Sequence, residues 1–300
     1  MKNRLVILVF LLFMIIPSKA QSIWDREHLE YVKRSLDNPC YSKAYQSLLK
    51  HADKALEEEP LSVMMKEWIP ASGDMHDYMS LARYYWPDPT TPDGLPYINR
   101  DGMSNPELEK LDRNRLSTTA NRIETLSLAW YFTGDEKYAK KAVEFIEVWF
   151  LNKKTRMNPN LEYAQMVPGR NGGKGRGFGV LDTYSFVEML DAVALLDSSK
   201  SFTARDAKRL KQWFCTLLDW ILSSDQGRSE KKQANNHGTA YDVQVVAFAL
   251  YAGQYDLAHK VISDFPKKRT FTQIMPDGSQ PHELRRTLSF HYSQYNLTHY

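Results

Sequence analysis

Two stretches of the chain resemble each other, and each has the pattern of two helices joined by a glycine. They cover residues 128–145 and 248–265, with Gly134 and Gly253 at the junctions and an alanine five residues after each glycine. Glycine at the end of a helix favours the left-handed conformation that stops it. Repeated helical hairpins predict a solenoid or a closed ring of helix pairs with one concave face.

Apolar residues recur at steps of three and four over most of the chain, which is the signature of amphipathic helices. No alternating strand pattern of any length is found. We therefore expect an all-α fold, an incomplete (α/α) toroid or barrel of antiparallel helix pairs. Its helices should lie within residues 24–56, 117–132, 135–149, 181–196, 204–222, 238–252 and 255–265.

The N-terminus has the three parts of a secretory signal peptide. Residues 1–4 carry two basic side chains, residues 5–16 are apolar, and small residues lead to Ala20. This order predicts cleavage after Ala20 and export to the periplasm or the medium. Because no later run of about 20 apolar residues exists, we expect no membrane association after cleavage. Residues 21–300 should form the mature domain.

The charge balance argues against some classes of partner. The chain has 39 basic and 36 acidic residues, a formal net charge of +3, and lacks the basic excess of a dedicated nucleic-acid binder. Cys40 and Cys215 are far apart in sequence, and either a disulfide or two separate thiols is compatible with the pattern. We expect neither a metal nor a cofactor, since the paired spacing of a zinc site is missing at His237, His282, His291 and His299.

One candidate site element is the run Asn235-Asn236-His237, which directly precedes an apolar helix. Backbone N–H groups at a helix N-terminus are unpaired and favour an anion, so these side chains suit a substrate carboxylate. The alternative is that Asn236 caps the helix and His237 packs beneath it. On local sequence alone, both interpretations stay open.

A second element follows the turn at residues 276–281. Glu283 and Arg286 are three residues apart, on one face of a helix, and are expected to pair. Tyr292 lies on another face of a straight helix. Either the helix breaks near Ser289 or only one of Arg286 and Tyr292 lines the site.

The long irregular segment at residues 75–105, called the aromatic loop below, is rich in proline, glycine and aromatic residues. A loop of this length in a compact domain is usually functional. Tyr85 and Trp86 suit stacking on sugar faces. Substrate hydroxyls and carboxylates are expected to bind His76, Asn121, Arg122 and Arg176.

Several motifs together resemble the alginate lyase family of α/α-toroid polysaccharide lyases. They are Asn-Asn-His-Gly at 235–238 with Tyr241, Asp-Gly-Ser-x-Pro-x-Glu-Leu-x-Arg at 277–286, and Tyr-Ser-x-x-Asn-Leu at 292–297. The segment at 77–87 and Gly-Arg-Gly at 175–177 also match. The resemblance runs from about Met75 to the C-terminus. It implies that residues 21–300 are an α/α-toroid lyase domain, truncated at the C-terminus because family members usually continue.

The resemblance implies a role for each matched residue. Tyr292 would transfer the proton, and Asn236, His237 and Arg286 would neutralise the carboxylate of a uronate. The guanidinium of Arg286 is expected to lower the pKa of the Tyr292 phenol. In well-known members a histidine follows the catalytic tyrosine, whereas here one precedes it, so two neighbours remain alternatives for part of this role. Those alternatives are His291 and Tyr295; the residues expected to bind substrate also include Asn235, Tyr241 and His291.

The sequence thus predicts a secreted polysaccharide lyase that cleaves an anionic uronic-acid polymer, mannuronate-rich alginate or glucuronan, by β-elimination. One alternative is an α/α-barrel glycoside hydrolase, which needs two carboxylates at the scissile bond. Another is a non-catalytic helical-repeat glycan-binding protein, which has no need to gather Asn236, His237, Arg286 and Tyr292 at one point. The polymer, the mode of cleavage and the oligomeric state stay open.

Overall fold

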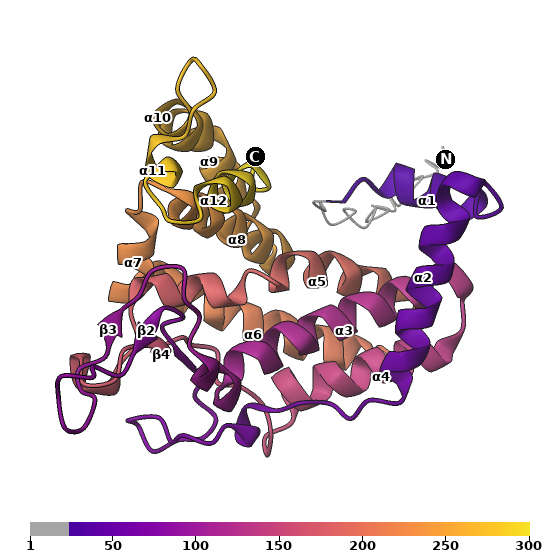
Figure 1. Cartoon of the computed structure of the whole chain (residues 1–300). Coiled ribbons are helices and arrows are strands. Elements are labelled where there is room, and N and C mark those ends of the chain that lie inside the picture. The colour runs from indigo at the N-terminus through magenta and orange to yellow at the C-terminus, as the bar shows by residue number, and fades with distance from the viewer. Residues whose placement is uncertain (1–23) are drawn as a thin grey trace, which may run out of the picture.

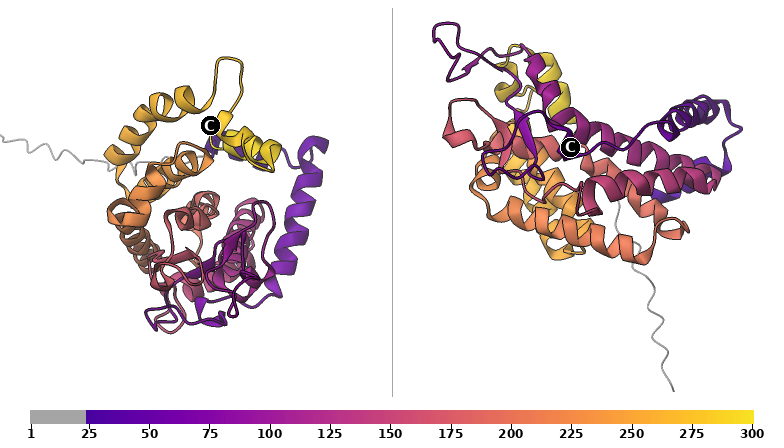
Figure 2. Two further views of the ribbon diagram at one scale, coloured as in Figure 1. Left: turned by 60° about the vertical axis from the view of Figure 1, so that its left-hand side comes forward. Right: turned by 90° about the horizontal axis from the view of Figure 1, so that it is seen from below.

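The computed structural model describes residues 24–300, and its helices follow one another around an arc (Figures 1 and 2). The helix pair α1 and α2 lies at one end of the arc, and α9 to α12 lie at the other. The predicted signal peptide, residues 1–20, lies outside the described residues. The long helices are α1 (Arg26–Arg34), α2 (Pro39–Leu56), α3 (Asp112–Thr133), α4 (Glu136–Ile146), α5 (Phe186–Val193), α6 (Ala204–Ser223), α8 (Asn236–Ala252), α9 (Tyr255–Phe265) and α12 (Ser289–Leu297).

Among the shorter elements, the strands lie at one side of the arc with the aromatic loop, whereas α10 and α11 lie beside α9 and α12. Strand β1 pairs with β4 in parallel, and β2 pairs with β3 in an antiparallel hairpin inside the aromatic loop. These elements are β1 (Met79–Leu81), β2 (Tyr85–Trp86), β3 (Ile98–Asn99), β4 (Tyr163–Met166), α7 (Asp225–Lys231), α10 (Phe271–Gln273) and α11 (Pro281–Leu284).

The two predicted helical hairpins are α3–α4 and α8–α9. Gly134 and Gly253 end the first helix of each pair in the left-handed conformation, with φ of 71° and 79°. Ala139 and Ala258 are buried where the paired helices approach each other. The expected all-α toroid of antiparallel helix pairs is therefore confirmed.

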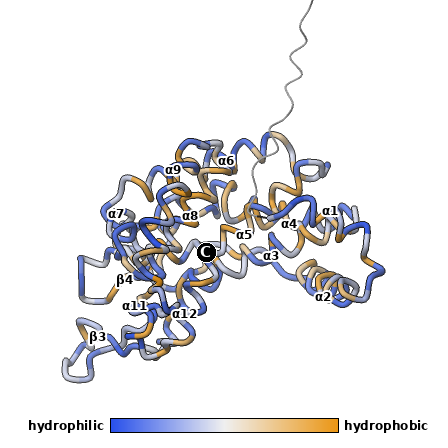
Figure 3. The backbone as a smooth tube through the Cα atoms, turned by 90° about the horizontal axis from the view of Figure 1, so that it is seen from above, coloured by the Kyte–Doolittle hydropathy of each residue, from blue (hydrophilic) through white to orange (hydrophobic). Residues whose placement is uncertain are grey.

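The core lies between α3, α5, α6 and α8, which pack on one another. Aromatic side chains fill its centre: the ring of Phe214 lies 5.5 Å from that of Phe248 and 5.7 Å from that of Phe186. Along several helices hydrophobic and hydrophilic residues alternate in short blocks (Figure 3), as a single buried face requires, whereas α8 is buried on most of its surface. No helix within residues 24–300 is long and apolar enough to cross a membrane.

Two predicted helices differ from those observed. The stretch 24–56 is divided in two, because Asn38 caps a new helix that starts at Pro39. The stretch 181–196 is α-helical only over α5; its flanks, Gly177–Thr183 and Ala194–Ser198, form 3-10 turns. Cys40 in α2 and Cys215 in α6 are both free thiols.

A buried ion pair anchors the start of the aromatic loop to α3. The Lys66 ammonium lies 3.1 Å from Asp112, and neither side chain is exposed to solvent. Lys66 also donates to the carbonyls of Val63 and Met75, while Asp112 accepts the backbone N–H of Met79 at 2.9 Å. Burial raises the pKa of Asp112 to about 6, against the opposing effect of Lys66. The pair thus fixes where β1 begins.

We expect Asp112→Asn to lower the free energy of unfolding by about 3 kcal/mol, because it leaves the buried Lys66 charge without its counter-ion. Chemical denaturation measures this loss. The matched control is Asp225→Asn, which breaks an exposed pair with Arg228 and should change stability little. Equal losses in both variants would contradict the role given to the buried pair.

Candidate active site

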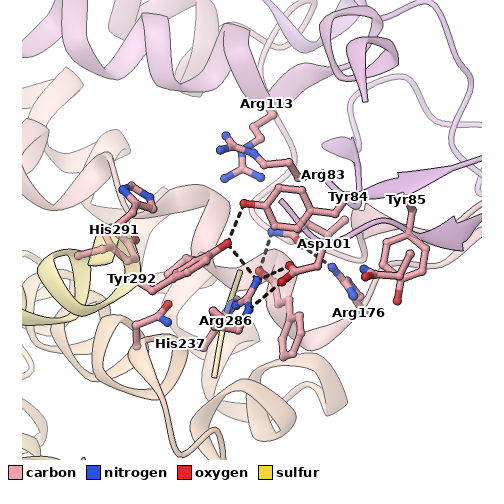
Figure 4. A pocket seen from close by; sticks show the side chains of 16 residues that line it. Arg83, Tyr84, Tyr85, Asp101, Arg113, Arg176, His237, Arg286, His291 and Tyr292 are labelled. Atoms are coloured by element: carbon pink, nitrogen blue, oxygen red, sulfur yellow. Dashed lines mark hydrogen bonds and ion pairs between the residues drawn. The ribbon is translucent and has the colours of Figure 1, made fainter. Parts of the chain in front are cut away.

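A cavity of about 620 Å³ opens where the aromatic loop, the start of α8 and the C-terminal elements meet (Figure 4). Five segments contribute its walls: the aromatic loop, the start of α3, residues 165–181, the start of α8 and residues 286–295. Its lining residues are Arg83, Tyr84, Tyr85, Asn99, Asp101, Arg113, Gln165, Arg176, Phe178, Leu181, Asn236, His237, Arg286, His291, Tyr292 and Tyr295.

The lining is strongly cationic. It holds four arginines, whereas Asp101 is its single carboxylate. Arg113 lies 3.4 Å from Asp182, a buried carboxylate that is not part of the lining. Arg83 has no ion-pair partner among residues 24–300. Such a cavity favours an anionic ligand. Within the same described range, no group of three or more His, Cys, Asp or Glu side chains is placed to hold a metal ion.

The start of α8 presents Asn236 and His237 to the cavity. Asn235, not Asn236, caps this helix, because its side chain accepts the backbone N–H of His237 at 3.3 Å. Asn236 is instead held by Glu283, whose two carboxylate oxygens accept its backbone N–H and its side-chain amide, each at 2.6 Å. The alternative in which Asn236 caps the helix and His237 packs beneath it is therefore wrong: Asn235 is the cap, and Asn236 and His237 both line the cavity.

His237 is held by two neighbours. Its Nδ1 lies 2.5 Å from Glu230, a carboxylate with no exposed surface. Its ring lies 4.3 Å from that of Phe178, and the Arg176 guanidinium lies 4.7 Å and 5.0 Å from the ring centres of Phe178 and Tyr85. Through Phe178 and Arg176, these contacts link His237 of α8 to Tyr85 of the aromatic loop. With Nδ1 engaged, Nε2 is the ring nitrogen left to interact with a ligand.

Arg286 and Tyr292 meet because the chain breaks between them. Helix α11 ends at Leu284 and α12 begins at Ser289, so the two side chains do not follow the geometry of one straight helix. The Arg286 Nη2 donates to the Tyr292 hydroxyl at 3.0 Å, and the guanidinium lies 4.0 Å from the centre of that ring. Both residues line the cavity, which resolves the alternative left by the sequence.

The predicted pair of Glu283 and Arg286 does not form. Glu283 points to Asn236, and Arg286 binds Asp101 of the aromatic loop at 2.7 Å. The carboxylates of Glu283 and Asp101 thus bind residues from distant segments. A rule based on helical spacing considers only residues three or four apart and cannot predict such pairs. Asp101 also accepts a hydrogen bond from the Thr287 hydroxyl at 2.8 Å.

The expectation of a lowered pKa for Tyr292 is wrong: Arg286 does act to lower this pKa, but the net shift is upward. Burial raises the pKa of the Tyr292 phenol well above its usual value, and the hydrogen bond with the Tyr84 hydroxyl, 2.7 Å away, adds to the increase. Arg286 acts in the opposite direction but is outweighed. The phenol is therefore protonated at neutral pH.

Several residues expected to bind substrate lie outside the cavity lining. His76 bonds through Nδ1 to the carbonyl of Arg156 at 2.6 Å, and the indole of Trp86 donates to the carbonyl of Met103 at 2.9 Å. Asn235 is the helix cap. The polar groups of these three side chains are occupied by backbone partners, whereas Tyr85, Arg176 and His291 do line the cavity.

Asn121, Arg122 and Tyr241 are also outside the lining. The first two lie in the middle of α3, about two turns beyond the end that carries Arg113. Arg122 forms a two-point ion pair with Glu58 of the α2 end, at 2.5 Å and 2.9 Å. Tyr241 is 2% exposed and packs in the core. Their roles as substrate ligands have no geometric support.

The other cavity residues were not predicted from the sequence. Arg83 and Tyr84 adjoin the predicted Tyr85, and their position in the loop could have indicated them. Arg113 is the second residue of a long helix and has no local signature. The remaining unpredicted residues become neighbours only through the tertiary fold: Asn99, Asp101, Gln165, Phe178 and Leu181.

Comparison with known proteins agrees with this geometry. The family model for alginate lyases matches residues 62–300. A crystal structure of an alginate lyase from Bacteroides ovatus is 53% identical, with a TM-score of 0.91, over 93% of this chain and 73% of that protein. A comparison with curated proteins finds no match.

More distant structures share the fold. Alginate lyase A1-III from Sphingomonas species A1 is 15% identical with a TM-score of 0.50, and this chain covers 66% of it. A variant of A1-III complexed with a tetrasaccharide is 14% identical with a TM-score of 0.52. In both cases 83% of this chain is covered. From the family model and the closely similar structure, we conclude that this chain belongs to the alginate lyase family of polysaccharide lyases.

Proposed function

We propose that this lyase cleaves a uronic-acid polymer, mannuronate-rich alginate or glucuronan, by β-elimination, with Tyr292 as the proton-transferring residue. The observation that carries the proposal is the position of the Tyr292 hydroxyl. It lies 3.0 Å from Arg286 and 2.7 Å from Tyr84 in the cationic cavity that Asn236 and His237 also line.

The first requirement of the reaction is to stabilise negative charge. The proton on C5 of a uronate is very weakly acidic, and its removal moves charge onto the neighbouring carboxylate. Donors aimed at that charge stabilise the transition state by a few kcal/mol each in a partly desolvated site. Asn236 and Arg286 supply an amide and a guanidinium for this purpose, and His237 donates from Nε2 in its protonated form, because Nδ1 is engaged by Glu230.

The second requirement is a proton path. The C5–H bond breaks as the phenolate of Tyr292 takes the proton, the C4–C5 double bond forms, and the bond from C4 to the glycosidic oxygen breaks. The same phenol returns the proton to that oxygen, so no proton is gained or lost. The raised pKa favours the acid half of this cycle. The base half depends on the phenolate, to which Arg286 and Tyr84 can both donate hydrogen bonds.

The geometry of the sugar selects the substrate. In mannuronate and glucuronate, H5 and O4 lie on the same face of the ring, so one residue can serve both steps. In guluronate they lie on opposite faces, and His237 would have to act as a separate base. Tyr85 and Arg176 are proposed to bind neighbouring sugars by stacking and by charge.

A hydrolytic reaction is less well supported. Hydrolysis with two catalytic carboxylates needs both beside the bond, separated by roughly 5–10 Å. Asp101 is the single carboxylate in the lining, and it is engaged by Arg286 and Thr287. The arginine-rich lining agrees better with elimination on an anionic polymer.

A polymer panel tests the substrate. Polymannuronate, polyguluronate and glucuronan are each incubated with the protein, and the absorbance of the unsaturated product is followed in the ultraviolet. We expect cleavage of polymannuronate or glucuronan with little cleavage of polyguluronate. A clear preference for polyguluronate would overturn the single-tyrosine mechanism.

Export remains part of the proposal. The basic and apolar pattern of residues 1–20 supports a signal peptide cleaved after Ala20. Sequencing the N-terminus of the protein recovered from the periplasm or medium of an expressing bacterium tests this. A start at Gln21 is expected, and retention in the cytoplasm with an intact N-terminus would contradict it.

A further inference from the structure

Asp101 is the one acidic side chain in the lining of a cavity that receives an anionic polymer, and it touches the catalytic machinery proposed above. We propose that Asp101 is a positioning residue of the elimination: its carboxylate fixes the Arg286 guanidinium against the Tyr292 hydroxyl. The catalytic part of this inference rests on the proposed function. The effect of Asp101 on Arg286 and Tyr292 does not depend on the substrate.

The contacts form a continuous chain across the cavity. Asp101 accepts from Arg286 Nη2 at 2.7 Å, the same Nη2 donates to Tyr292 at 3.0 Å, and Tyr292 meets Tyr84 at 2.7 Å. The first and last residues belong to the aromatic loop, and the two between belong to the C-terminal elements. Figure 4 shows this chain as dashed lines. The carboxylate therefore closes a bridge between segments 185 residues apart in sequence.

Local structure holds Asp101 in place. Thr287, the neighbour of Arg286, donates its hydroxyl to the second Asp101 oxygen at 2.8 Å. Gly102 follows with φ of +83°, and a side chain at that position would meet the Thr287 hydroxyl at 3.1 Å. The loop can approach the C-terminal elements this closely because residue 102 has no Cβ.

The charge of Asp101 also acts on Tyr292. It neutralises part of the Arg286 charge, so it opposes the effect by which Arg286 would favour the phenolate, and it contributes to the raised pKa of Tyr292. Other titratable and charged groups share the cavity with this phenol, and they come from every surrounding element. They are Arg83, Tyr84 and Tyr85 of the aromatic loop, Arg113 of α3, Arg176, His237 of α8, Arg286, and His291 and Tyr295 of α12.

The variant Asp101→Asn removes the negative charge of this side chain but keeps its hydrogen-bonding atoms in place. An asparagine oxygen can still accept from Arg286, and its amide can donate to the Thr287 hydroxyl, so the bridge is retained while the negative charge is lost. Arg286 then acts on Tyr292 with its full charge. We expect the phenol of Tyr292 to ionise at a pH lower by about one unit. Asp93→Asn is the matched control, because Asp93 is an exposed aspartate of the same loop outside the cavity.

The experiment titrates Tyr292 directly, by NMR of labelled tyrosine ring carbons in the whole protein, with the signal assigned from Tyr292→Phe. The inference predicts a lower midpoint in Asp101→Asn and no change in Asp93→Asn. An unchanged midpoint in Asp101→Asn overturns the electrostatic half of the inference, and the positioning half is tested by Asp101→Ala below. Because this readout needs no substrate, it remains decisive even if the protein does not cleave uronate polymers.

Kinetics supply the second arm. On the polymer that the panel identifies, the limb of the pH profile that requires the phenolate should move to lower pH in Asp101→Asn. In Asp101→Ala, which loses the bridge as well, kcat should fall at least tenfold relative to Asp101→Asn because Arg286 is no longer held. If the two variants differ from the wild type only in KM, Asp101 merely repels substrate and the positioning role is wrong.

Discussion

Tyr292→Phe should lower kcat/KM for uronate polymer cleavage by about a thousandfold, because it removes the group that takes and returns the proton. The substitution deletes a single hydroxyl and keeps the ring that packs beneath Arg286. Binding should change much less than turnover, so the loss is expected in kcat. Steady-state assays of the unsaturated product provide the measurement.

The matched control is Tyr295→Phe. Tyr295 lies three residues further along α12, lines the same cavity, and has no hydrogen-bond link to Arg286 among the contacts of residues 24–300. We expect it to lose less than about tenfold. The reverse result, a severe loss in Tyr295→Phe with activity kept in Tyr292→Phe, would transfer the catalytic role to Tyr295. Thermal melting of both variants checks that the fold is intact.

The second large effect is expected for His237→Ala. Removing a donor from the group that stabilises the developing charge should lower kcat by roughly a hundredfold on polymannuronate or glucuronan. The variant should also be less stable, because Glu230 has no exposed surface and would lose its imidazole partner. Turnover and thermal melting are measured together.

A double variant separates the two effects. In His237→Ala combined with Glu230→Gln, the buried carboxylate is replaced by a neutral amide, so much of the lost stability should return. Activity should stay low, because the imidazole is still missing. If activity recovered together with stability, His237 would have only a structural role and the proposed set of donors would be incomplete.

The fold could be predicted from the sequence where its determinants are local. Helical periodicity and the glycines at 134 and 253 indicated the two hairpins, because amphipathic spacing and a left-handed cap depend only on neighbouring residues. The predicted helix boundaries were wrong where a local signal interrupts the apolar pattern. One example is Pro39, which starts a new helix inside a continuous apolar pattern.

The cavity could be predicted only in part, for a physical reason. Asn236, His237, Arg286 and Tyr292 lie in short motifs, and the structure brings all of them to one cavity. The carboxylates that hold these groups could not be paired from spacing, since Glu283 meets Asn236 across 47 residues and Asp101 meets Arg286 across 185. The pKa of Tyr292 was misjudged because burial cannot be seen in a motif.

The most direct test of the central claim is to cleave the polymer in water enriched in the heavy oxygen isotope and to weigh the products. β-Elimination breaks the bond between C4 and the glycosidic oxygen without adding water, whereas hydrolysis places one water oxygen in a product. We predict unsaturated oligosaccharides, each lighter than the saturated oligosaccharide of the same length by the mass of one water, and without heavy oxygen at C1 when the reducing ends are trapped by reduction before they exchange. Saturated products that each carry one heavy oxygen would contradict the account.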